Sequence, residues 1–464
     1  MRLLSFEVTG LFERFDYIIE LNQTDRITIL HGPNGYGKTT VLQMLGHTLD
    51  ARFASLADMP FRSMKLSFDT GPTLTFSVED ATERDESTTR RPQPRPRKRL
   101  RVQFGSETVI IKPLSQRSRE RIAEMASQFA QGFERVGEDQ WLDVRTGRLM
   151  SFETLLSLHS ENLPPPFRDV LNHEEHAAVR QLRELLQKMH VFVIDTQRLI
   201  ANRNLEMIEQ APRTRIWRNR VERREIETTL AAVTYSALLR DAIRDHLRRY
   251  GVKASELDKS LPFRILSSDI SVVDTDALRT RYNNVLDRRQ RLVKAGLLQE
   301  QAGGDITLPQ TLHELQKQVF RFYLDDMETK LSVFGGFTER VQLFTEMINE
   351  LFKYKQIEVG AEDGFRFRTE EGSILSAGDL SSGEQHQLVL LFDLLFRVDE
   401  RSLILVDEPE ISLHVEWQQC VLKNFQAISQ LRDLDFLVAT HSPDIIHDRW
   451  DLTIALAEQE HTHA

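Results

Sequence analysis

A glycine-rich segment near the start of the chain constrains its fold more than any other feature. Residues 32–39 read Gly-Pro-Asn-Gly-Tyr-Gly-Lys-Thr and match the pattern G-x-x-x-x-G-K-[ST]. An apolar run, Ile27 to Leu30, precedes the segment and predicts a buried strand, and a helical pattern from Val41 to Leu49 follows it. Glycines at these positions let backbone N–H groups converge on phosphate oxygens at the amino end of the helix. The sequence therefore predicts a phosphate-binding loop in an α/β fold.

This loop supplies most of the predicted nucleotide contacts. We expect Lys38 to reach the β- and γ-phosphates and to take part in catalysis, and the Thr39 hydroxyl to bind Mg²⁺. The predicted cofactors are accordingly ATP and Mg²⁺. The predicted nucleotide-binding residues of the loop are Gly32, Pro33, Asn34, Gly35, Tyr36, Gly37, Lys38, Thr39 and Thr40.

A second motif, which ends in two acidic residues, lies far downstream. Residues 403–408 read Leu-Ile-Leu-Val-Asp-Glu, which predicts a buried parallel strand that carries two carboxylates at its carboxyl end. In this position Asp407 would hold Mg²⁺, and Glu408 would act as the base that orients or deprotonates the attacking water. Apolar strands that end in an acid are common, so the pairing with the phosphate loop carries the prediction.

Two further motifs complete an ordered series along the chain. Ser381, Ser382, Gly383 and Glu384 precede an apolar helix and predict a second phosphate site at a helix amino end, although a simple N-cap would also explain the serines. His441 follows the apolar strand Phe436 to Thr440 and is a candidate to touch the γ-phosphate. Phe12 and Phe15 are candidates either for stacking on the base or for the core.

Composition narrows the class of protein. The 464 residues suffice for two or three domains, and the single cysteine, Cys420, excludes an internal disulfide or a tetrathiolate zinc site. A formal net charge of −10 disfavours general adhesion to nucleic acid, so nucleic acid is a less favoured partner. Neither a secretory signal nor a membrane-spanning apolar stretch is evident, and we expect a cytoplasmic protein without a membrane partner.

The pattern of elements predicts three regions. Residues 1–200 would form the amino-terminal part of the nucleotide-binding head, with strand hairpins, a charged excursion at 81–101 and a helical stretch from Ser115 to His190. Residues 201–350 would form a helical insertion, and residues 351–464 the rest of the head. Apolar positions predict two antiparallel helices around Gly303 and Gly304, forming either a protruding arm or a compact lobe. The expected apolar faces are Leu278, Tyr282, Val285 and Leu292 in one helix and Leu312, Leu315, Val319 and Phe322 in the other.

The order of the four motifs resembles the ABC-type ATPase superfamily, in its OLD-like and SMC/RecF-related branch. The resemblance implies an α/β head of the ABC-type P-loop ATPase kind, formed by both chain ends, with a helical insertion that forms a short antiparallel coiled-coil arm. It also implies that Ser381 and Gly383 grip the γ-phosphate bound to a partner subunit in a homodimer or larger oligomer. By the same resemblance Gln197 looks like the Q-loop residue that senses Mg²⁺, residues 412–414 look like the D-loop, and His441 looks like the switch histidine.

OLD nucleases continue into a Toprim domain, but residues 442–464 are too few for a domain of ~100 residues. Residues 257–264, which read Leu-Asp-Lys-Ser-Leu-Pro-Phe-Arg, the Asp-Thr-Gln-Arg segment at 195–198 and the size of the chain resemble the ATPase subunits of two-gene anti-phage systems, AriA of PARIS systems first and PtuA of Septu next. This resemblance implies an ATP-hydrolysing sensor that holds a separate nuclease effector and releases it on sensing a phage-encoded trigger protein. The basic residues between Arg90 and Arg101 are a candidate trigger surface, or else a solvated loop.

A DNA-binding repair or recombination ATPase of the RecF type is the alternative function. It predicts that DNA stimulates hydrolysis, with an affinity that falls steeply with salt. A nuclease in its own right has less support, because we find no second acidic or histidine cluster suited to metal-dependent cleavage.

Both functions predict the same loss of hydrolysis when the strand-end carboxylates are removed. Replacing Asp407 or Glu408 by alanine removes the Mg²⁺ ligand or the base, so steady-state ATP hydrolysis should fall to background. Phosphate release assays on the purified variants check this, and hydrolysis at the wild-type rate by the Glu408→Ala protein would contradict the assignment.

Overall fold

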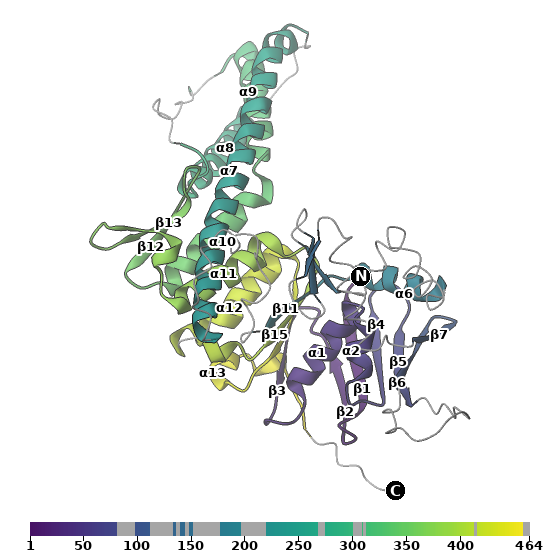
Figure 1. The fold of residues 1–464 in the computed structure, drawn as a ribbon. Helices are drawn as coiled ribbons and strands as arrows, with labels where there is room; N and C mark the ends of the chain where they lie inside the picture. The colour runs from purple at the N-terminus through teal and green to yellow at the C-terminus, as the bar shows by residue number, and fades with distance from the viewer. Residues whose placement is uncertain are drawn as a thin grey trace, which may run out of the picture. The chain divides into compact units, whose positions relative to one another are not determined.

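Two compact units make up the chain in a computed structural model. The first unit comprises Met1–Thr214 together with Val398–Ala464, and the second comprises Arg215–Arg397 (Figure 1). The structure describes residues 1–80, 98–111, 133–135, 140–143, 148–151, 177–195, 220–267, 274–299, 309, 312–412 and 415–457. Both chain ends therefore lie in the first unit, and the α/β fold predicted from the sequence is confirmed.

An antiparallel sheet forms one layer of the first unit, with strand order β2-β1-β4-β5-β6-β7. The two hairpins expected among the first 80 residues are confirmed, as β1 with β2 and β4 with β5. The expected excursion at 81–101 is shorter than predicted, because β6 begins at Lys98 and Arg101 forms an ion pair with Glu79. Residues 81–97 lie outside the described part of the chain. The strands are β1 (Leu3–Leu11), β2 (Phe15–Glu20), β4 (Ser63–Phe68), β5 (Leu74–Asp80), β6 (Lys98–Phe104) and β7 (Glu107–Ile111).

A parallel sheet forms the second layer, in the order β11-β15-β16-β3-β17. All four pairings are parallel, and β16 lies between β3 from the start of the chain and β15 from its last quarter. Continuous apolar runs such as residues 403–406 suit strands that are covered on both faces. The strands are β3 (Ile27–His31), β11 (Val191–Asp195), β15 (Leu403–Asp407), β16 (Asp435–Ala439) and β17 (Thr453–Ala455).

Shorter elements surround these two sheets. Within the stretch expected to be helical, only α6 (Ala177–Gln187) is a described helix, whereas β8 (Phe133–Arg135), β9 (Gln140–Asp143) and β10 (Arg148–Ser151) form an antiparallel sheet. The helical prediction is wrong there, because strands of three or four residues are too short to show a period and depend on their partners. The remaining elements are α2 (Phe53–Ala57), η4 (Pro409–Ser412), α12 (Val415–Arg432), α13 (Pro443–Ile446) and η5 (Trp450–Leu452).

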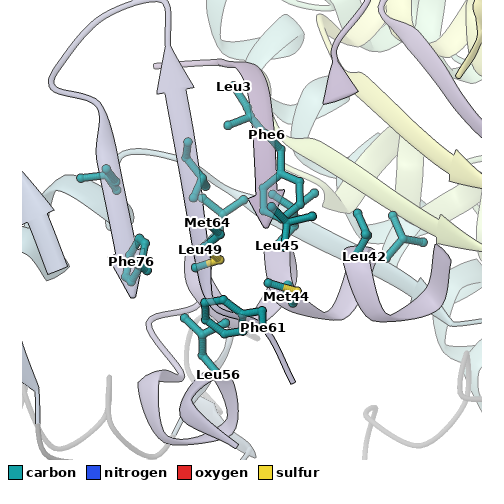
Figure 2. Close-up of a cluster of buried hydrophobic side chains, with 14 of the residues drawn as sticks. Leu3, Phe6, Leu42, Met44, Leu45, Leu49, Leu56, Phe61, Met64 and Phe76 are labelled. Atoms are coloured by element: carbon teal, nitrogen blue, oxygen red, sulfur yellow. The ribbon is translucent and has the colours of Figure 1, made fainter. Parts of the chain in front are cut away.

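Helix α1 (Lys38–Leu49), which follows the glycine-rich loop, is buried on several sides. Leu45 and Leu49 lie among side chains of the antiparallel sheet, including Phe6 and Met64 (Figure 2), and Leu42 belongs to the same hydrophobic cluster. The same hydrophobic cluster includes Leu403, Leu405 and Leu437 of the parallel sheet. Burying one such side chain stabilises the fold by about 1.5–3 kcal/mol, so this helix is held firmly by apolar packing.

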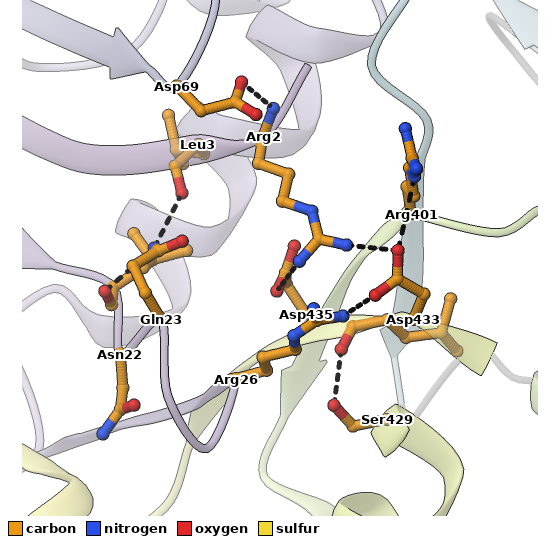
Figure 3. Close-up of polar contacts among 12 residues, drawn as sticks. Arg2, Leu3, Asn22, Gln23, Arg26, Asp69, Arg401, Ser429, Asp433 and Asp435 are labelled. Carbon is orange, nitrogen blue, oxygen red and sulfur yellow. Dashed lines mark hydrogen bonds and ion pairs between the residues drawn. The ribbon is translucent and has the colours of Figure 1, made fainter. Parts of the chain in front are cut away.

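An ion-pair network attaches the first strand to the turn before β16. The Asp433 carboxylate forms ion pairs with Arg2, Arg26 and Arg401 (Figure 3). The guanidinium of Arg2 also lies 3.7 Å from the carboxylate of Asp435. Burial raises the pKa of the Asp435 carboxyl, and the charges of Arg2 and Arg26 oppose that rise. The network joins residues at opposite ends of the chain within one unit.

The second unit consists of long helices and a small antiparallel sheet. This unit extends to Arg397, beyond the boundary at residue 350 expected from the pattern, because β13, η2 and α11 pack against α7. Gly364 shows how close this packing is: its φ is 75°, and a Cβ there would lie 1.8 Å from the Ser236 carbonyl oxygen. The elements are α7 (Arg220–Leu266), α8 (Thr275–Lys294), α9 (Glu314–Ser332), α10 (Gly335–Leu351), β12 (Lys355–Gly360), β13 (Gly364–Thr369), β14 (Ile374–Leu375), η2 (Ala377–Asp379), α11 (Ser382–Phe392) and the π-helical turn η3 (Asp393–Arg397).

Within this unit α7, α8 and α9 run side by side as an arm (Figure 1). Ion pairs of Arg264 with Asp326 and of Asp258 with Lys330, both 2.7 Å, show that α7 and α9 are antiparallel. A helix of 47 residues such as α7 is about 70 Å long.

The antiparallel partner of α9 is therefore α7 rather than α8. Arg281 of α8 pairs with Asp325 of α9, and the backbone carbonyl of Arg291, further along α8, accepts a hydrogen bond from the Gln342 side chain in α10. Because α10 follows α9 along the chain, α8 runs in the same direction as the α9–α10 segment. The apolar face expected for α8 is buried as predicted, but in α9 Leu315 and Val319 are exposed. The sequence pattern did not reveal α7 as the partner, because a helical period says nothing about which helix covers it.

A partly buried histidine makes the first unit sensitive to acid. Burial in α1 lowers the pKa of His47 to about 4, with Arg52 as a smaller cause, so the unfolded chain binds this proton at higher pH than the folded chain. The free energy of unfolding should therefore fall as the pH drops from about 6.5 to about 4, by about 2 kcal/mol at pH 5 for this one group. Between pH 7 and pH 5 the Tm of His47→Gln should fall by about 3 °C less than the Tm of the wild type.

The exposed residue His447 provides the matched control. His447→Asn keeps a residue that tolerates the positive φ of 50° at that position and should leave the pH dependence unchanged. Equal Tm losses in the wild type and both variants, measured by differential scanning calorimetry, would contradict the prediction.

Candidate functional site

The glycine-rich loop connects β3 to α1 and adopts a backbone that its sequence requires. Gly37 has a φ of 84°, and a Cβ there would lie 2.8 Å from Leu11 Cδ2 and 3.3 Å from the ring of Phe12. Glycine is therefore needed both for the left-handed backbone and for the close approach of the first strand. The loop ends on the first turn of α1, whose free backbone N–H groups attract anions.

Lys38 extends back across its own loop. Its ammonium donates hydrogen bonds to the carbonyl oxygens of Gly32 at 2.7 Å and Pro33 at 3.1 Å. The residue is buried, and this burial lowers the pKa of Lys38, while the carboxylates of Glu408 and Asp407 oppose the shift. A cation held at the mouth of a glycine loop is placed to contact a phosphate.

The strand-end acid predicted to bind metal lies beside the loop threonine. Asp407 ends β15 in register with Ala439 of β16, which pairs with Leu30 of β3, so the three strand ends form one row. Thr39 Oγ1 donates a hydrogen bond of 3.2 Å to Asp407 Oδ1. A hydroxyl and a carboxylate side by side are hard oxygen ligands, and they fit Mg²⁺ bound together with phosphate oxygens.

Glu408 follows directly in an unusual backbone conformation. Its φ is 46°, which is strained for a residue with a side chain, and its N–H donates to the carbonyl of Ala439 at 2.8 Å. Its Oε1 lies 3.7 Å from Nε2 of His441. This sharp turn directs the carboxylate toward the loop after β16.

His441 completes the group. Its Nδ1 lies 3.3 Å from Lys38 Nζ, so the histidine lies within reach of both the cation and the proposed base. The structure thus brings together Lys38, Thr39, Asp407, Glu408 and His441 from three segments of the chain.

Sequence reasoning missed one group beneath the loop. Tyr17 of β2 donates a hydrogen bond of 2.9 Å to the carbonyl of Tyr36, and Phe15 lies between the two rings at 5.7 and 5.2 Å. Burial raises the pKa of Tyr17 to about 12, so the hydroxyl keeps its proton at neutral pH.

Phe15 belongs to the core and is 5% exposed, whereas Phe12 is 44% exposed. The alternation of buried residues in β2 was the only sequence signal for Tyr17.

The serine-glycine motif lies in the second unit, at the amino end of α11. The Ser381 side chain caps the helix and donates to Glu384 at 2.8 Å, while Lys355 donates to both oxygens of Glu384. Burial alone would raise the pKa of Glu384, but the hydrogen bonds from Lys355 and Ser381 hold it below its ordinary value. Ser381 and Ser382 are exposed, and Gly383 is half-buried.

Some predicted residues lie outside the described part of the chain. Gln197 is two residues beyond the described end of β11, and residues 413 and 414 of the expected D-loop follow η4. Within the described residues, no group of three or more His, Cys, Asp or Glu side chains is placed to hold a metal ion, and no helix is long and apolar enough to cross a membrane.

Comparison with known proteins supports a nucleotide-dependent enzyme. The family model of the AAA ATPase domain matches residues 1–446. A probable ATPase of retron Ec83 from Escherichia coli is 31% identical over 84 residues, a stretch that spans 16% of this chain and 15% of that protein.

Solved structures give a more distant likeness. The Smc head domain of Pyrococcus furiosus, with an extended coiled coil and bound to the C-terminal domain of ScpA, is 13% identical at a TM-score of 0.32. The SMC head domain of Thermotoga maritima is 11% identical at a TM-score of 0.31. Each alignment covers 98% of this chain and 94% of the other.

Removing the Tyr17 hydroxyl should weaken nucleotide binding. Tyr17→Phe keeps the ring stack but leaves the Tyr36 carbonyl without its donor, at a cost of about 0.5–1.5 kcal/mol or about 2–12-fold in Kd for ATP. Tyr354→Phe, at a tyrosine that is 71% exposed, is the matched control and should bind as the wild type does. Titration with a fluorescent ATP analogue measures both, and equal Kd values for the two variants would refute the role of this hydrogen bond.

Proposed function

Given that this chain belongs to the family of AAA ATPase domains and is an ATPase, we propose that it serves as the sensor and scaffold subunit of an anti-phage defence system. The convergence of Lys38, Asp407, Glu408 and His441 on one sheet edge supports the nucleotide-hydrolysing part of this proposal. In this proposal the energy of hydrolysis acts on another protein.

The geometry supports the following course of hydrolysis. The phosphates lie against the N–H groups of the loop and the first turn of α1, where Lys38 exchanges its carbonyl partners for the β- and γ-phosphate oxygens. Thr39 and Asp407 hold Mg²⁺, which neutralises charge on the β- and γ-phosphates when bound. Glu408 accepts a proton from the attacking water while the oxygen of that water bonds to the γ-phosphorus. The bond between the γ-phosphorus and the β–γ bridging oxygen breaks, and ADP and phosphate are released.

His441 stabilises the negative charge that develops in the same step. Its imidazole, near both Lys38 and Glu408, donates a hydrogen bond to a γ-phosphate oxygen as negative charge develops there. Glu408, Lys38 and His441 are thus the proposed catalytic residues.

A second copy of the chain completes the site in this proposal. Ser381, Ser382, Gly383 and Glu384 start an 11-residue helix whose amino end suits the γ-phosphate bound to a partner subunit. The Ser381 hydroxyl then exchanges its bond to Glu384 for a phosphate oxygen. The protein accordingly works as a homodimer or larger homo-oligomer, with Gln197 sensing Mg²⁺.

The partners follow from the resemblance to AriA of PARIS systems and PtuA of Septu. A separate Toprim-type nuclease is the effector held by the ATPase, a phage-encoded protein is the trigger, and both meet the ATPase in the cytoplasm. The local likeness to a retron ATPase is compatible with an ATPase subunit of such a system.

A phage challenge tests the role in defence. Cells that carry the gene with its native neighbours should lose protection when Lys38 is replaced by alanine, because the phosphates lose their cation. Lys259→Ala, at an exposed lysine of α7, is the control and should protect fully. Undiminished plaque suppression by the Lys38→Ala strain would reject the proposal.

A pull-down separates this function from the DNA-repair alternative. Tagged Glu408→Gln protein, expressed with its gene neighbours, should bring down a nuclease-like protein in a complex of defined native mass. Recovery of DNA after a salt wash, without a protein partner, would instead support a RecF-like ATPase.

A further inference from the structure

The loop that carries His441 is held by a carboxylate from a different strand. Glu410 follows β15 in the 3-10 helix η4, whereas Thr440 and His441 follow β16. Glu410 Oε1 accepts a hydrogen bond of 2.7 Å from the backbone N–H of His441. The Thr440 hydroxyl lies 2.9 Å from both carboxylate oxygens of Glu410.

Further contacts make this loop a connected structure. The Thr440 hydroxyl accepts a hydrogen bond from the N–H of Ser442 at 3.0 Å. The Ser442 hydroxyl donates to Gln418 of α12 at 2.8 Å, and Gln418 donates to the Glu410 carbonyl at 3.4 Å. The loop is thus tied through both the side chain and the backbone of Glu410.

The chemistry of the carboxylate suits this task. An ionised carboxylate offers only acceptors, and here the N–H of His441 and the hydroxyl of Thr440 are both donors. The contact to the His441 N–H is direct, so Glu410 determines where the Cα of the histidine lies. The His441 side chain is 30% exposed and its imidazole lies 3.3 Å from Lys38, so packing alone does not fix the ring and the backbone anchor contributes to its position.

We propose that Glu410 is a positioning residue for hydrolysis, which holds the Thr440–His441 peptide so that the imidazole faces the γ-phosphate. Glu410 acts through His441 and touches no reacting atom. The inference rests on the proposed role of His441 in hydrolysis.

Steady-state ATP hydrolysis by the full chain tests the proposal through a double-mutant cycle. Glu410→Ala should lower kcat at least about tenfold and change KM for ATP less than about threefold, because the Glu410 charge acts on Lys38 less than the charges of Glu408 and Asp407 do. His441→Ala should lower kcat by a similar factor. Adding Glu410→Ala to His441→Ala should then cost less than about threefold, because the group that Glu410 positions is already absent.

Two further variants separate positioning from general stability. Glu410→Gln keeps one acceptor oxygen for the His441 N–H and should retain an intermediate kcat, and this variant also tests the proposal if the alanine variant does not fold. Glu20→Ala, at an exposed carboxylate of β2, is the matched control and should keep the wild-type kcat.

The outcomes distinguish the inference from the function on which it rests. A normal kcat for Glu410→Ala, or losses that multiply in the double variant, would overturn the positioning role while leaving His441 in place. A normal kcat for His441→Ala would contradict the proposed role of the histidine, and the inference about Glu410 would fall with it.

Discussion

The parallel pairing of β16 with β3 on one side and β15 on the other is the interaction on which the site depends. It aligns Leu30, Ala439 and Asp407 in one row, so the segments that follow the three strands leave the sheet at the same edge. The phosphate loop, the carboxylates and the histidine loop are therefore neighbours although they are up to about 400 residues apart. In a parallel sheet the carboxyl ends of neighbouring strands necessarily meet in this way.

Apolar packing then makes that edge rigid. Helix α1 contributes Leu42, Leu45 and Leu49 to a core shared by the antiparallel and parallel sheets (Figure 2). The amino end of this helix is the phosphate loop, so the position of the anion site follows from the burial of the helix. The arginines around Asp433 reinforce the arrangement by tying β1 to the turn that precedes β16 (Figure 3).

Polar contacts set the finer geometry at the sheet edge. The left-handed backbone of Glu408 and the bonds of Glu410 to the histidine loop place the Glu408 carboxylate and the His441 imidazole near Lys38. Beneath the phosphate loop, the Tyr17 hydroxyl holds the Tyr36 carbonyl through a hydrogen bond. Glu410 and Tyr17 each use a side chain to hold a backbone peptide, whereas Glu408 is held through its own backbone N–H. The site is thus built from fixed loops on rigid strands.

Local patterns in the chain were enough to predict the phosphate loop, the strand ending at Asp407, the strand before His441 and the apolar face of α8, because each depends on neighbours within a few residues. The same patterns did not reveal β8–β10, the pairing of α7 with α9, or the roles of Tyr17 and Glu410. These features depend on residues that are distant in sequence. A short strand is stable only when paired with another strand, and a helical period does not indicate which helix packs against it. The role of a hydroxyl or carboxylate depends on the peptide group with which it forms a hydrogen bond. Residue chemistry was therefore readable along the chain, whereas the alignment of that chemistry required the long-range strand pairing and core packing.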